Sequence, residues 1–147
     1  PGVTPLIDAA AGIDSPVLSP DGRYLAYRSW TGGNPERYVT RYPSMDGRWL
    51  VGGAEGAARW SGDGKELFFV EGSPYRMMAA AVQIDPMFSS GTPRALFDLA
   101  QNGAAPFQRF DVSPDGKHFA MVRGMGAPDK QRNIVVVENW FEEFKKR

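Results

Sequence analysis

Short apolar runs alternate with polar stretches rich in glycine and proline along the whole chain. The clearest case has Pro16-Val17-Leu18 before Ser19-Pro20-Asp21-Gly22 and an aromatic and aliphatic run, 24–27, after it. Short runs bounded by turn residues are typical of β-strands rather than of helices. The pattern therefore predicts an all-β chain of short strands joined by tight turns.

The four-residue turn recurs twice further along. Ser113-Pro114-Asp115-Gly116 is identical to the first copy, and Ser61-Gly62-Asp63-Gly64 differs only in having glycine in place of proline. In such a turn proline presets φ, aspartate accepts hydrogen bonds from nearby backbone, and glycine adopts a positive φ. Each copy predicts a hairpin, and Gly62 predicts a looser second turn. The chain is thus expected to be a repeat protein.

The predicted strands fall into three units, 15–52, 57–99 and 108–138. The turn copies are 42 and then 52 residues apart, a spacing typical of four-stranded β-propeller blades. Four strands are predicted in each of the first two units and three in the last. They span 16–18, 24–28, 37–42 and 48–51, then 58–60, 67–70, 76–83 and 95–99, then 108–112, 118–122 and 133–137.

The two ends of the chain complete the expected architecture. Residues 5–10 predict one more strand, which would give the last blade its fourth strand. Residues 139–145 predict a short C-terminal helix with Asn139 as its N-cap. The fold prediction is therefore a single domain over 1–147, with three four-stranded blades, half of a six-bladed ring.

The composition of the chain argues against several kinds of partner and chemistry. The 17 basic and 17 acidic residues cancel, so no net field favours nucleic acid. No apolar run is long enough to insert into a membrane. The chain has no cysteine, which excludes disulfides, thiolate catalysis and cysteine zinc sites.

Catalytic and metal-binding patterns are missing from the sequence. His118 is the single histidine, and the matching positions of the other units hold Tyr24 and Glu66, which indicates an exposed polar position. Neither a Gly-x-Ser-x-Gly elbow nor a phosphate-binding glycine loop occurs. One aspartate per turn supplies too few oxygen ligands for calcium, so these aspartates are interpreted as turn formers. We expect no enzyme activity, no metal and no cofactor.

Binding residues are sought on the innermost strand of each blade, beside the channel of a propeller. Strand alternation separates two sets of matching positions there. The apolar set, Leu18, Trp60 and Val112, is predicted to pack between blades. The other set, Val17, Arg59 and Asp111, is predicted to line the channel wall.

Four candidate ligand-binding residues follow: Arg59, Asp111, the nearby Arg109, and Trp30, which opens a glycine-rich loop. An exposed loop tryptophan is typical of a binding surface. A solvated channel wall without a ligand is the alternative interpretation.

Each turn copy is followed by Arg or Lys and then by an aromatic-aliphatic strand. This pattern resembles the TolB-like propeller repeats of bacteria, which are also described as WD-repeat-like. Arg41-Tyr42-Pro43 and the segment 135–143 resemble a branch in which propellers form the C-terminal sensor part of membrane-bound serine/threonine kinases. The resemblance implies a non-catalytic scaffold that binds a protein or ligand at the channel mouth, in a periplasmic or other extracytoplasmic location. The alternatives are an accessory or sensor propeller of a larger enzyme, a kinase or peptidase whose catalytic part is absent here, and a repeat protein whose only role is assembly.

Three blades are too few for a closed ring, because propellers contain at least four. An open ring would leave a blade face and a sheet edge in water. Two copies arranged head to tail would give six blades, with the strand at Leu6 and Ile7 of each chain completing the other's last sheet beside 134–137. We therefore predict a homodimer, with a piece of a longer propeller as the alternative.

Overall fold

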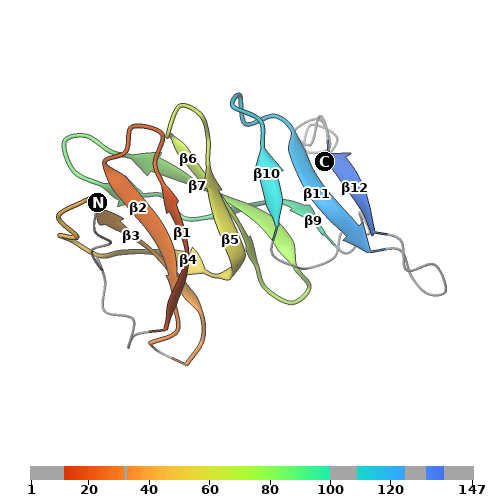
Figure 1. Cartoon of the computed structure of the whole chain (residues 1–147), viewed down its shortest axis with the longest axis horizontal. Coiled ribbons are helices and arrows are strands. Elements are labelled where there is room, and N and C mark those ends of the chain that lie inside the picture. Colours follow the sequence, from red (N-terminus) through yellow and green to blue (C-terminus); the bar gives the residue numbers. More distant parts are fainter. Residues whose placement is uncertain (1–11, 32, 100–108, 125–131, 138–147) are drawn as a thin grey trace, which may run out of the picture.

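The computed structural model describes residues 12–31, 33–99, 109–124 and 132–137 (Figure 1). Every regular element in this part of the chain is a β-strand, and the strands form three antiparallel sheets. The all-β prediction is confirmed for these residues. The predicted strand at 5–10 and the predicted helix at 139–145 lie outside the described residues.

Sheet 1 has four strands paired in chain order. They are β1 (Ile13–Leu18), β2 (Tyr24–Ser29), β3 (Glu36–Arg41) and β4 (Trp49–Gly53). Each overlaps one of the predicted strands of the first unit.

Sheet 2 repeats this order and adds one short strand. Its strands are β5 (Glu55–Trp60), β6 (Glu66–Glu71), β7 (Arg76–Gln83), β8 (Ser89–Ser90) and β9 (Arg94–Asp98). Both β8 and β9 pair with β7, one after the other along it: β9 pairs with the range 76–79 and β8 with Val82 and Gln83. The sequence predicts β9 but not β8, because a two-residue strand leaves no hydrophobic pattern.

Sheet 3 contains β10 (Phe110–Val112), β11 (Phe119–Gly124) and β12 (Arg132–Val137), again in chain order. Three strands are present in the described part of this sheet. A fourth strand, predicted from 5–10, falls outside that part and stays a prediction.

The three sheets follow one another along the long axis of the molecule (Figure 1), and an apolar cluster fills each of the two spaces between them. Phe69 belongs to the cluster shared with sheet 1, and its neighbour Phe68 belongs to the cluster shared with sheet 3. Adjacent residues of a strand point to opposite faces, so β6 is buried on both sides. This explains why its sequence is continuously apolar from Leu67 to Val70.

The first strands of the three sheets, β1, β5 and β10, lie next to one another (Figure 1). The indole Nε1 of Trp60 in β5 donates a hydrogen bond to the Val17 carbonyl of β1 at 3.3 Å. This arrangement places the innermost strands of neighbouring units side by side, as the repeat predicts.

One side-chain prediction for β1 is wrong: Val17 is partly buried against the cluster between sheets 1 and 2 rather than on a channel wall. Leu18, predicted to pack between blades, is 44% exposed in the single chain, so its packing stays a prediction. The stacked sheets turn each face of an inner strand towards a neighbouring sheet. Trp60 and Val112 have such a neighbour on their side, whereas no described sheet precedes sheet 1 on the side of Leu18.

Candidate binding site

Each repeated turn is held together by its serine as well as by its aspartate. Ser19 Oγ accepts a hydrogen bond from the Tyr24 amide at 2.9 Å and donates one to Asp21 Oδ1 at 2.6 Å. Asp21 Oδ1 also accepts from the Arg23 amide at 3.1 Å. The same contacts recur at Ser61 and at Ser113. Sequence reasoning missed this role of the serine, although its presence in all three copies was the available signal.

The turns of sheets 2 and 3 touch through Gly62. Its amide donates a hydrogen bond to the Pro114 carbonyl at 3.1 Å, and a Cβ at this position would lie 2.4 Å from the same oxygen. Proline would remove the donor and add the clash. The glycine therefore permits a contact between neighbouring turns, a role that the sequence did not reveal.

The turn serines favour the ionised form of the aspartates. The hydrogen bond from Ser61 is the main reason that the pKa of Asp63 is lowered, and Ser113 lowers the pKa of Asp115 in the same way. Burial raises the pKa of Asp21, but hydrogen bonds from Ser19 and Arg23 outweigh it and bring the pKa to about 2. All three turns are therefore held by charged carboxylates.

We expect these turns to make the fold sensitive to acid. The pKa of each turn aspartate lies below its ordinary value of 3.8, so its stabilisation is complete above that value and is lost as the pH falls through the lowered pKa, which is about 2 for Asp21. Urea unfolding at a series of acidic pH values should show a smaller loss of stability in a variant with Asp21→Asn, Asp63→Asn and Asp115→Asn than in the natural chain. Asp46→Asn, outside the repeat, should behave like the natural chain. Parallel losses in the natural chain and the triple variant would contradict the prediction.

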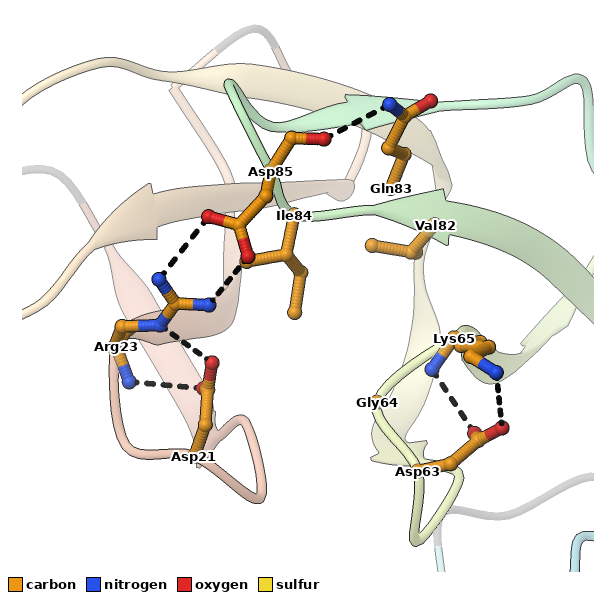
Figure 2. Close-up of a pocket in the computed structure, with 9 residues that line it drawn as sticks. All are labelled: Asp21, Arg23, Asp63, Gly64, Lys65, Val82, Gln83, Ile84 and Asp85. Carbon is orange, nitrogen blue, oxygen red and sulfur yellow. Dashed lines mark hydrogen bonds and ion pairs between the residues drawn. The ribbon is translucent and has the colours of Figure 1, made fainter.

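An open pocket of about 390 Å³ lies where the first two turns face the end of β7 (Figure 2). The first turn contributes Asp21 and Arg23, and the second contributes the range 63–65. The end of β7 and the residues after it contribute the range 82–85. The rim thus carries three carboxylates and two cations, while Val82 and Ile84 provide apolar surface.

Arg23 connects two sides of this pocket. Its guanidinium nitrogens Nη1 and Nη2 lie 3.2 and 3.0 Å from the two carboxylate oxygens of Asp85, and its Nε lies 2.7 Å from Asp21 Oδ2 (Figure 2). Lys65, across the pocket, lies 3.7 Å from an Asp63 oxygen and keeps most of its side chain exposed. Lys65 is therefore the cation of this pocket with more freedom to contact a ligand.

Arg59 and Asp111, two of the predicted site residues, are brought together by the fold. Arg59 Nε in β5 lies 3.3 Å from Asp111 Oδ1 in β10, and both side chains remain partly open to solvent, at 34% and 77%. Arg59 Nη1 also donates to the Ala58 carbonyl at 2.8 Å. Arg109 is exposed directly before β10. The inner strands of sheets 2 and 3 thus share an accessible ion pair, which we name the Arg59–Asp111 pair.

Trp30 lies apart from that pair, at the end of β2. The Arg28 guanidinium lies 4.9 Å from the centre of the indole ring, and the indole Nε1 donates to Asp14 Oδ2 at 3.4 Å. Arg28 and Asp14 are themselves joined by an ion pair. Trp30 is therefore a partly exposed ring on a fixed support, near the start of β1 rather than near the turns.

Arg37 in β3 is fully buried between sheets 1 and 2. Its Nη2 donates to the Gly56 carbonyl at 2.7 Å, while Nε and Nη1 have no hydrogen-bond partner within the described chain. Burial, followed by the charge of Arg28, lowers the pKa of Arg37 to about 10, so it is still charged at neutral pH. In sheet 2 the matching position holds Met77, which is apolar.

Arg37→Met is expected to raise the free energy of unfolding by about 1–2 kcal/mol, because it removes unpaired buried donors at the cost of one hydrogen bond. Urea unfolding measures this change. Arg76→Met, at an exposed arginine of β7, should shift stability by less than about 0.5 kcal/mol. An Arg37→Met variant that is less stable than the natural chain would contradict this prediction. It would show that the buried guanidinium makes a stabilising interaction that methionine cannot replace.

The serine, histidine and aspartate of the third turn lie close together without forming a catalytic triad. His118 Nδ1 is 3.5 Å from Ser113 Oγ and 3.8 Å from Asp115 Oδ1. Ser113 Oγ already donates to Asp115 and accepts from the His118 amide, as in the two turns that lack histidine. The histidine therefore does not activate the serine. Within the described residues, no group of three or more potential ligands could hold a metal ion.

Stacked antiparallel sheets built on one repeated hairpin, with their first strands side by side, define a propeller-like all-β protein. The crystal structure of TolB from Acinetobacter baumannii superposes on this chain with a TM-score of 0.61 and 22% sequence identity, over 84% of this chain and 29% of that chain. The chain therefore has a TolB-like β-propeller fold and spans less than a third of that neighbour. The sequence matches no family model and no curated protein. The described part of the chain contains no helix that is long and apolar enough to cross a membrane.

Proposed function

We propose that this chain is a non-catalytic β-propeller scaffold that binds a protein or a small ligand at the inner strands, around the Arg59–Asp111 pair. The observation that supports this is the partial exposure of two opposite charges contributed by neighbouring inner strands. The sheet faces beside them are apolar and filled by packing. A polar, accessible pair between such sheets can exchange its internal contact for a ligand's charges.

The scaffold assembles, in this proposal, as a homodimeric six-bladed propeller, with 5–10 as the strand that completes the last sheet. The resemblance to TolB-like repeats supports a periplasmic or other extracytoplasmic location. A role as the sensor propeller of a larger kinase or peptidase would keep the same binding surface and place catalysis in another part of that enzyme.

A random peptide library displayed on phage tests the binding surface. Peptides selected on the natural chain should lose about tenfold or more in affinity for Arg59→Ala and for Asp111→Ala, about the cost of one charge-assisted contact. Lys117→Ala, an exposed cation of the third turn, is the control and should bind as the natural chain does. Selected peptides that bind all variants equally would contradict the proposal that the Arg59–Asp111 pair is the binding surface.

A further inference from the structure

The exposed large hydrophobic residues of the described chain are concentrated at the two ends of the stack of sheets. Four of the six lie there: Leu18 and Leu50 in sheet 1, and Ile134 and Val136 in sheet 3. Ile134 is 78% exposed and Val136 is 55% exposed. Such groups in a row on a sheet face are typical of an interaction surface.

The outer face of sheet 1 can be traced by strand register. Leu18 pairs with Leu25, and Leu50 pairs with Tyr38, which itself pairs with Tyr27. These five residues define the sheet-1 end face, on which Leu18 and Leu50 are exposed while Leu25 and Tyr27 are already buried within the single chain. The residues between them, Tyr24, Ala26 and Val39, point the other way and pack against sheet 2.

The free face of sheet 3 is defined in the same way. Ala120 pairs with Val136, and Val122 pairs with Ile134. These four residues define the sheet-3 end face. Their neighbours in β11, Phe119 and Met121, point the other way into the cluster shared with sheet 2.

The repeat makes the sheet-1 end face equivalent to a face that is already used inside the molecule. Counted from the turn serines, Leu18, Leu25 and Tyr27 correspond to Trp60, Leu67 and Phe69. Those three residues are among the ones with which sheet 2 packs on sheet 1. The sheet-1 end face is therefore built to receive a preceding sheet.

The sheet-3 end face is equivalent to the opposite side of the same contact, the face of sheet 1 that packs on sheet 2. Its Ala120 and Val136 correspond to Ala26 and Val39, with which sheet 1 packs on sheet 2. This chain thus carries both halves of one sheet-on-sheet contact, at opposite ends of the same stack.

We propose that the sheet-3 end face of one copy packs on the sheet-1 end face of a second copy, twice, closing a ring of two chains. The proposal rests on the propeller scaffold above and names the surfaces that join its two halves. The contact is head to tail, so two copies bury both end faces, and a twofold ring leaves neither exposed. Three sheets per chain give six in the ring, within the size range of propellers.

Sedimentation analysis of the natural chain should give twice the chain mass of 16.2 kDa. Ile134→Asp and Leu50→Asp should each weaken the dimer by about 100-fold or more, because each buries an unpaired carboxylate at both contacts. Both side chains are exposed in the single chain, so circular dichroism should show that the variants remain folded. Met87→Asp, at an exposed residue outside both end faces, is the matched control and should remain dimeric.

Mixing the two weakened variants distinguishes a head-to-tail contact from a symmetric one. Ile134→Asp keeps a natural sheet-1 end face and Leu50→Asp keeps a natural sheet-3 end face, so the mixture restores one of the two contacts and should form mixed dimers. A symmetric contact between sheet-3 faces would leave Leu50→Asp fully dimeric, which would overturn the proposal. A natural chain that is monomeric, as expected for a piece of a longer propeller, would also overturn it. Peptide binding that depends on Arg59 would still support the proposed function.

Discussion

Replacing Phe119 with alanine is expected to lower the free energy of unfolding by about 3–5 kcal/mol. Phe119 is fully buried in β11, and its ring centre lies 5.1 Å from that of Phe68, 5.6 Å from that of Phe97 and 6.2 Å from that of Phe110. These partners come from β6, β9 and β10, so the ring joins sheet 3 to sheet 2. Alanine would leave a cavity that the surrounding strands cannot close without breaking their register.

Urea unfolding followed by tryptophan fluorescence measures this loss. Met87→Ala removes a comparable apolar side chain from an exposed position and should change stability by less than about 0.5 kcal/mol. A loss below about 1 kcal/mol for Phe119→Ala would mean that sheet 3 contributes little to the cooperative unit.

Gly62→Pro should destabilise the protein by about 3 kcal/mol or more, even though it restores the residue that the other two turns contain. The Gly62 amide donates to the Pro114 carbonyl at 3.1 Å, and proline has no such donor. An added Cβ would also lie 2.4 Å from that carbonyl oxygen, where backbone cannot move aside cheaply. Proline would also restrict the unfolded chain, which stabilises the folded state, but only by about 1 kcal/mol at most.

The reverse change in the first turn is the control for this prediction. Pro20→Gly should cost no more than about 1 kcal/mol, because it mainly increases the freedom of the unfolded chain. Thermal or urea unfolding of both variants compares the two effects. A Gly62→Pro variant as stable as the natural chain would show that the contact between the second and third turns is dispensable.

Much of the local structure could be predicted from the sequence because its causes are local. The φ values of Gly22, Gly64 and Gly116 are 70°, 70° and 71°, as the turn pattern requires. Strand positions followed from apolar runs bounded by those turns. The two-residue strand β8 could not be predicted, since its pairing depends on β7 rather than on its own residues.

The candidate site was only partly predictable. Arg59 and Asp111 were identified because the repeat places them at matching positions of neighbouring units, and the ion pair between them is in the structure. The pocket beside the first two turns could not be predicted. Its residues come from three segments of the chain, and Arg23 meets Asp85 from 62 positions away. The buried charge of Arg37 was missed for the same reason, because its surroundings come from other strands.

The amino-acid sequence by itself determined the hairpins, their repetition and the identity of the strands, since turn residues and apolar runs act over a few neighbouring positions. Only the tertiary structure decided which face of each strand is covered. Leu18, Trp60 and Val112 share one place in the repeat, yet Leu18 is exposed while Trp60 is buried and Val112 partly so. The physical reason is that burial depends on the sheet that stacks against a residue, and among the described residues no sheet stacks on the outer face of sheet 1.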